Sequence, residues 1–243
     1  MRGEFAAPSQ SHNAAHMRAA RLMNLVPDGA GDKVLRAAIE DVFPFRIAAL
    51  SSFGAESAVV LHMIATIDPA TPVIFLDSGQ LFAQTLQYQE ALSDRLGLTN
   101  VRVQHPDQRD ISKADPDGML WKSDPEACCR LRKVILMERS LEGFDAWITG
   151  RKRFQGGRRV TLPVVEVESK RVKINPLAGW SPDDVEAYFE KHDLPRHPLW
   201  EFGYLSIGCH PCTRPVAAGE DPRAGRWDGL DKTECGIHGN PWG

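Results

Sequence analysis

The sequence contains no cysteine before Cys128 and no apolar run near the roughly 18 residues that a membrane-spanning helix needs. Its first ten residues lack the apolar stretch of a secretory signal peptide, so we expect a cytoplasmic protein without membrane association. A net charge of −3 gives no general excess of positive charge, which argues against a nucleic-acid-binding protein. With 243 residues, of which 42% are hydrophobic, the chain can form a core without disulfides; a homo-oligomer is left open.

Short apolar runs alternate with helical patterns over most of the chain. Parallel strands are predicted at 46–50, 72–77, 101–104 and 145–149, and a hairpin at 164–167 and 171–174. This alternation predicts an α/β fold with a doubly wound, mostly parallel sheet. We expect an N-terminal arm at 1–33, an α/β domain at 34–218 and a mobile, Gly/Pro-rich segment at 219–243.

The loop Ser51–Ser57 joins the first predicted strand to a helix. Backbone N–H groups at the start of a helix attract anions, Gly54 allows a ligand to come close, and the serine hydroxyls add donors. The loop is not a Walker motif, and the other interpretation is an ordinary β–α turn with capping serines. Because such folds bind ligands at the carboxyl ends of their strands, 77–79 and Gly150 are candidate contacts too.

Five cysteines lie in the second half of the chain. Cys128 and Cys129 are adjacent, and Cys209 and Cys212 form a C-x-x-C motif. Four thiolates can bind zinc or a [4Fe–4S] cluster. The adjacent pair favours the cluster, because two neighbouring thiolates on one zinc would close a strained ring. The C-x-x-C motif alone also fits a redox disulfide, and the adjacent pair alone could be two buried residues of a helix. The fifth thiol, Cys235, suggests an enzyme rather than a structural clip.

Five motifs together carry a family resemblance. They are Ser51-x-x-Gly54-Ala55-Glu56, Leu76-Asp77-Ser78-Gly79, Cys128-Cys129-x-x-Arg132-Lys133, Gly208-Cys209-x-x-Cys212-Thr213-Arg214-Pro215 and Glu234-Cys235-Gly236-x-His238. From about residue 45 to residue 238 the sequence resembles the assimilatory sulfonucleotide reductases, which have an adenine nucleotide alpha hydrolase-like fold. The double cysteine with C-x-x-C resembles the [4Fe–4S] adenylyl-sulfate branch, since members that use phosphoadenylyl sulfate mostly keep only the last cysteine.

The resemblance implies thioredoxin-dependent reduction of adenosine 5′-phosphosulfate to sulfite and AMP, in sulfate assimilation and cysteine biosynthesis. Cys235 would attack the sulfur, forming an S-sulfocysteine that a thiol of thioredoxin, or glutaredoxin, resolves. Nearby Lys232 and His238 can favour the thiolate of Cys235. The four other cysteines would hold the cluster, for which we expect an electrostatic and positioning role rather than a redox one.

The same resemblance implies a set of substrate contacts. The anionic substrate calls for preformed cationic donors. Lys133 would lie between cluster and substrate, Arg153 on the substrate, and Arg223 with Arg226 on the sulfate. The remaining contacts expected are Ser51, Ser52, Gly54, Ala55 and Glu56 near the ribose and phosphate, Asp77, Gly79 and Leu81 at the adenosine, and Gly150 and His238.

Two departures and three alternatives accompany this interpretation. Phe53 stands where the family often has a serine, and Ala127 where it often has a glutamate. The first alternative is a phosphoadenylyl-sulfate reductase. The second is an ATP-dependent tRNA thiolation enzyme, to which the basic run at 151–159 gives some support. The third is a redox-sensing cluster protein, in which Cys235 would be dispensable.

Overall fold

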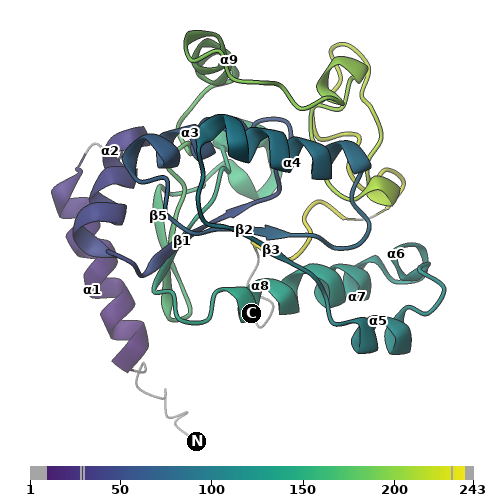
Figure 1. Ribbon diagram of the computed structural model, residues 1–243, viewed down its shortest axis with the longest axis horizontal. Coiled ribbons are helices and arrows are strands. Elements are labelled where there is room, and N and C mark those ends of the chain that lie inside the picture. The colour runs from purple at the N-terminus through teal and green to yellow at the C-terminus, as the bar shows by residue number, and fades with distance from the viewer. Residues whose placement is uncertain (1–9, 28, 30, 231, 239–243) are drawn as a thin grey trace, which may run out of the picture.

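A six-stranded sheet forms the centre of the protein, whose computed structural model describes residues 10–27, 29, 31–230 and 232–238 (Figure 1). The strand order is β3–β2–β1–β4–β6–β5, with β5 antiparallel to β6 and every other pairing parallel. The doubly wound, mostly parallel sheet predicted from the sequence is thereby confirmed. The strands are β1 (Ile47–Ser51), β2 (Val73–Leu76), β3 (Val101–Gln104), β4 (Ala146–Ile148), β5 (Val165–Glu168) and β6 (Arg171–Ile174).

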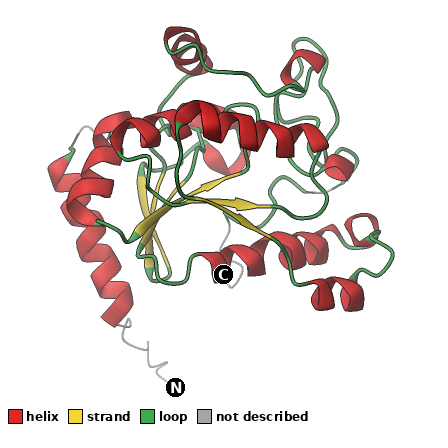
Figure 2. Cartoon of the chain, in the orientation of Figure 1, coloured by secondary structure: helices red, strands yellow, loops and turns green. Residues whose placement is uncertain are grey.

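Helices cover both faces of the sheet. Helices α3 and α4 lie on one face, and α7 and α8 on the other (Figures 1 and 2). The helices are α1 (Gln10–Leu25), α2 (Gly31–Arg36), α3 (Ser57–Ile67), α4 (Ala83–Leu96), α5 (Gln108–Ala114), α6 (Leu120–Ser123), α7 (Pro125–Cys129), α8 (Ile135–Ser140) and α9 (Pro182–Lys191), with π-helical η1 (Ala37–Val42) and η2 (Arg130–Val134). Short 3₁₀ turns are η3 (Arg153–Gln155), η4 (Gly157–Arg159), η5 (Trp200–Phe202) and η6 (His210–Cys212).

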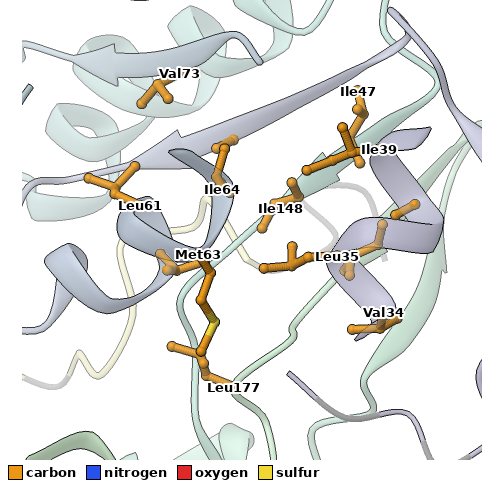
Figure 3. Close-up of a cluster of buried hydrophobic side chains, with 14 of the residues drawn as sticks. Val34, Leu35, Ile39, Ile47, Leu61, Met63, Ile64, Val73, Ile148 and Leu177 are labelled. Carbon is orange, nitrogen blue, oxygen red and sulfur yellow. The ribbon is translucent and has the colours of Figure 1, made fainter. Parts of the chain in front are cut away.

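Strands β1, β2 and β4 are largely apolar on both sides because each side of the sheet has its own core. Ala48 and Trp147 pack with residues of α8, whereas Ile47 and Ile148 belong to the larger cluster on the other face (Figure 3). Successive side chains of a strand point to opposite faces, so a strand buried on both sides is a continuous apolar run. This explains why these strands could be recognised in the sequence.

Helix α1 is packed onto the domain. It contacts β5, β6 and η1, and its residues Ala15 and Leu22 are buried. The predicted N-terminal arm therefore includes a helix, Gln10–Leu25, that packs against the sheet. Residues 1–9 of the predicted arm lie outside the described residues, and the division of the chain into three segments stays a prediction.

The sheet order creates a crevice at the carboxyl ends of β1 and β4. Strand β1 lies between β2 and β4. The chain passes from β1 to β2 on one side of β1, and later returns to form β4 on the other side. Loops that diverge at such a point leave room for a ligand. The C-terminal segment, yellow in Figure 1, runs beside this edge of the sheet.

Candidate active site

A cavity lies at this edge, and most of the expected substrate contacts line it. Its walls come from the loops after β1 and β4, from the 205–208 segment, and from the C-terminal segment. The expected residues among its lining are Ser51, Ser52, Gly54, Ala55, Glu56, Leu81, Lys133, Gly150, Arg223, Arg226, Cys235 and His238.

The loop after β1 is shaped by a buried phenylalanine. Phe53 has a positive φ of 47°, and its N–H donates to the Ser51 Oγ at 3.1 Å. Its ring is fully buried and meets Phe75 edge-on, with 5.1 Å between centroids. A non-glycine residue in this region is strained, and the packing of the ring compensates. The departure at Phe53 therefore serves the core, while Gly54 and Glu56 face the cavity at the start of α3.

Three expected contacts lie outside the cavity lining. The Asp77 Oδ1 accepts the N–H of Gly79 at 2.9 Å, and this tight turn carries both residues past the cavity wall. Arg153 is exposed, and its Nε donates to the carbonyl of Leu162 at 2.8 Å. The substrate contacts expected of Asp77, Gly79 and Arg153 stay predictions.

Three other cations of the same basic run lie at the cavity. Arg151, Lys152 and Arg159 line the cavity and are buried. The Lys152 Nζ lies 2.8 Å from the Glu56 Oε2, and Arg151 pairs with Glu166. Burial lowers the pKa of Arg151, although Glu166 opposes this. The usable signal in the sequence was the position of Arg151 and Lys152 directly after the fourth strand.

Glu234 holds the C-terminal segment over the cavity. Its Oε1 and Oε2 accept from the Arg159 Nε and Nη2 at 2.6 and 2.9 Å, and the Arg223 Nη2 lies 3.6 Å away. Burial acts to raise the pKa of Glu234, but the hydrogen bond and charge of Arg159 hold it below its ordinary value. Arg223 also donates to the carbonyl of Thr233 at 3.0 Å. These contacts place the neighbouring Cys235 on the cavity wall.

Two buried nitrogens of the cavity have no hydrogen-bond partner among the described residues. They are the Arg226 Nε and the His238 Nδ1. The Arg226 guanidinium lies 4.4 Å from the Trp227 ring centroid. It also packs closely against Gly208, because a Cβ added to Gly208 would lie only 2.2 Å from the Arg226 Nη2. The His238 ring stacks on Trp147. Because buried polar groups are normally paired, the two orphaned nitrogens point to a bound polar ligand.

The four remaining cysteines line a second, smaller cavity. Cys128 and Cys129 end α7, which starts with Pro125 and is capped by the Asp124 Oδ1, an acceptor for the Ala127 N–H at 2.9 Å. Cys209 directly precedes η6, and Cys212 is the last residue of η6. The lining residues are Gln80, Trp121, Pro125, Cys128, Cys129, Arg132, Lys133, Cys209, Pro211, Cys212, Arg226 and Trp227.

The electrostatics of this second cavity suit a bound cationic group. Burial raises the pKa of Cys128 to about 11 and that of Cys129 to about 12. Burial acts in the same direction on Cys209, but the charge of Lys133 and a hydrogen bond from Ser78 leave its pKa below the ordinary value. Coordination to a metal centre would deprotonate all four thiols. Lys133 lines both cavities and so lies between the thiols and the larger cavity.

A buried ion pair positions the helix of the adjacent cysteines. Arg132, in the π-helical segment η2, pairs with Asp115 at 2.6 Å and donates to the carbonyl of Ser78 at 2.8 Å. Ser78 in turn lies 3.2 Å from the Cys209 sulfur. The π-helical turn, a feature frequent at functional sites, thus links both halves of the cysteine set.

The sequence is similar to those of known proteins. Residues 46–215 match the family described as "Phosphoadenosine phosphosulfate reductase domain". Among curated relatives, the adenosine 5′-phosphosulfate reductase of Chelativorans sp. (strain BNC1) is 53% identical over 192 residues, 79% of this chain and 78% of the relative. The corresponding reductase of Mesorhizobium japonicum is 51% identical over 206 residues, 85% of this chain and 81% of the relative.

Solved structures show the same fold. The phosphoadenylyl-sulfate reductase of Candida auris has a TM-score of 0.67 and 29% identity, covering 84% of this chain and 97% of its own. The FMN adenylyltransferase of Candida glabrata has a TM-score of 0.54 at 17% identity, covering 87% of this chain and 70% of its own, and shows the likeness of fold alone.

Proposed function

The chain belongs to the phosphoadenosine phosphosulfate reductase domain family, and we propose that it is an oxidoreductase reducing adenosine 5′-phosphosulfate to sulfite and AMP in sulfate assimilation. One observation carries the proposal. Cys235 lies on the wall of a cation-lined cavity that shares Lys133, Arg226 and Trp227 with a cavity lined by four cysteines.

The cavity offers complementary groups for an anionic nucleotide. The backbone of 54–56 at the start of α3 suits the phosphate and ribose. The orphaned nitrogens of Arg226 and His238 suit the sulfate oxygens. Lys133 can follow the negative charge as it passes to the leaving AMP. Arg151, Lys152 and Arg159 already have carboxylate partners, so they mainly organise the wall.

The reaction divides into two displacements at sulfur. The Cys235 thiolate attacks the sulfate sulfur, an S–S bond forms, and the S–O bond to AMP breaks with its electron pair leaving on the phosphate oxygen. A thiol of thioredoxin or glutaredoxin then attacks the Cys235 sulfur and expels sulfite. The second thiol of that partner closes its disulfide and returns Cys235 as a thiol, so the dithiol is oxidised and the sulfuryl group reduced.

The four-cysteine cavity fits a [4Fe–4S] cluster held by Cys128, Cys129, Cys209 and Cys212. All four thiols line one shared cavity. The adjacent Cys128 and Cys129 would close a strained ring on a single zinc, whereas a cluster offers a separate iron for each sulfur. When bound, the cluster would join the two cysteine pairs and supply local charge beside Lys133.

The location and the substrate preference complete the proposal. No helix in the described ranges has both the length and the hydropathy to cross a bilayer. The free thiols suit the reducing cytoplasm, where thioredoxin is available. The four-cysteine set favours adenosine 5′-phosphosulfate over its 3′-phosphorylated form, although the Candida auris structure belongs to a phosphoadenylyl-sulfate reductase.

Sulfite formation with purified protein and reduced thioredoxin tests the function. We expect turnover of adenosine 5′-phosphosulfate, little turnover of the 3′-phosphorylated nucleotide, and ³⁵S label on Cys235 when the reductant is omitted. Iron and sulfide analysis with an anaerobic absorption spectrum tests the cluster separately. A protein that bears no label at Cys235 would refute the covalent step.

A further inference from the structure

Lys232 has an unusual position for a residue of the C-terminal segment. It lies three residues before Cys235, yet it does not line the larger cavity. Its side chain is only 4% exposed and forms an ion pair with Glu126 of α7, the helix that ends in Cys128 and Cys129. The segment that carries the nucleophile therefore inserts a cation toward the four-cysteine site.

Glu126 is an insufficient partner for so buried a cation. Its side chain is 74% exposed, and ion pairs with a solvated partner contribute little. The Lys232 ammonium also lies 5.9 Å from the Trp227 ring centroid and within electrostatic range of Cys129 and Cys212. A buried cation needs compensating negative charge, and thiolates of the cysteine set would supply it.

Backbone hydrogen bonds anchor the chain before Lys232, and the last of them joins the Leu230 N–H to the carbonyl of Trp227 at 2.8 Å. The Arg214 N–H donates to the carbonyl of Gly225 at 2.8 Å, and the Trp227 N–H to that of Cys212 at 3.1 Å. Residues up to Trp227 are thus anchored to the C-x-x-C loop. Gly229 follows with a φ of +75° and open space around its Cα. Lys232 is the first described side chain beyond Gly229 that is buried, since Leu230 is exposed.

We propose that Lys232 is a positioning residue that docks the Cys235 segment onto the iron–sulfur site, so that closure of this segment depends on the negative charge of the cluster and its thiolates. The inference rests on the proposed function, because it requires the cluster. The segment that docks contains Lys232 and Cys235. The coupling between the cluster and the docked segment is reciprocal. If the cluster favours docking of the segment, the docked segment in turn protects the cluster from solvent.

The test compares holoenzymes of the wild type, Lys232→Met, Lys232→Arg and Lys170→Met. Lys170 is an exposed lysine of the β5–β6 turn and serves as the matched control. The first readout is the rate of Cys235 alkylation by iodoacetamide, measured by mass spectrometry. We expect Lys232→Met to raise it roughly tenfold, as for loss of one buried charge-assisted contact. Lys232→Arg and Lys170→Met should stay near the wild-type rate.

The second readout separates the two displacement steps. In Lys232→Met, transfer of ³⁵S-sulfuryl to Cys235 should slow, while reduction of the preformed adduct by thioredoxin should speed up, because an undocked segment is easier to reach. A merely structural defect would slow both steps, and that result would overturn the proposal. Glu126→Gln should raise the alkylation rate of Cys235 by less than a third of the increase seen in Lys232→Met. An equal increase would mean that Glu126, and not the cluster, holds Lys232, and it would overturn the dependence on the cluster.

The iron and sulfide contents of the same samples distinguish failure of the proposed cofactor from failure of the proposed role of Lys232. A wild type without a cluster would overturn the proposed cofactor and this inference with it. Cluster-loaded Lys232→Met that alkylates at the wild-type rate would overturn the inference alone. Faster bleaching of the cluster by air in Lys232→Met would support the reciprocal shielding, and unchanged bleaching would refute it.

Discussion

Glu234 is the residue whose substitution most directly tests how Cys235 is held. We expect Glu234→Gln to release the C-terminal segment from the cavity. The wild-type carboxylate accepts from Arg159 at 2.6 and 2.9 Å, and Arg223 lies 3.6 Å away. Glutamine keeps the shape and one acceptor oxygen, but it removes the charge that compensates two guanidinium groups.

The size of the effect follows from the burial of the pair. Removing one partner of a fully buried ion pair costs about 3–5 kcal/mol. Here the Arg159 side chain is 10% exposed and that of Glu234 is 21% exposed, and one hydrogen bond survives in glutamine. About 2 kcal/mol is therefore reasonable, which corresponds to a roughly 30-fold larger open population.

The assay is iodoacetamide labelling of Cys235 at neutral pH, where Glu234 is ionised. Its depressed pKa means that its contribution is present above the ordinary carboxyl pKa and is lost only as the pH falls through the lower folded value. The matched control is Glu220→Gln, which breaks an ion pair with Arg214 in the same segment, where the side chains are 32% and 39% exposed. This control should change labelling by less than about threefold. Equal labelling rates in both variants would refute the role of the Arg159–Glu234 pair.

Four further outcomes are expected. Cys235→Ser should abolish sulfite formation and leave the visible cluster spectrum unchanged; sulfite formation by this variant would disprove the nucleophile. Lys133→Met should lower kcat about 100-fold, as for loss of one donor to the developing charge, and a change confined to KM would contradict that role. Asp115→Asn should lower the iron content after purification, because Arg132 loses its buried carboxylate partner; full iron content would argue against that positioning. Burial lowers the pKa of His197 to about 4. The free energy of unfolding, measured by chemical denaturation, should therefore fall by about 3 kcal/mol as the pH is lowered from 6.5 to 4. In His197→Gln this pH dependence should be weaker.

The fold was predictable because its signals are local. Buried parallel strands such as β2 are continuous apolar runs, and α9 begins with Ser181, whose Oγ accepts the Asp184 N–H at 3.1 Å. The packing of helix α1 could not be predicted from its own sequence, because β5 and β6, which it contacts, lie far along the chain.

The candidate site was predictable in its chemistry but not in all its members. The cysteine motifs indicated both the cluster set and the nucleophile, and the structure gathers the first four around one cavity. Arg153 was expected from its match to a family arginine, and the structure adds Arg151, Lys152 and Arg159 of the same basic run to the cavity lining. The direction of a side chain in an irregular loop depends on backbone turns that residue type does not reveal.

The amino-acid sequence by itself determined the sheet, the loop Ser51–Ser57 and which thiols are available. Periodicity and residue chemistry are properties of neighbouring residues, so both can be read from the sequence. Only the tertiary structure decided that Glu234 meets Arg159, that Lys232 turns toward α7, and that Lys133 separates two cavities. Those contacts join residues far apart in the chain, and their formation depends on the packing of the whole sheet and its helices.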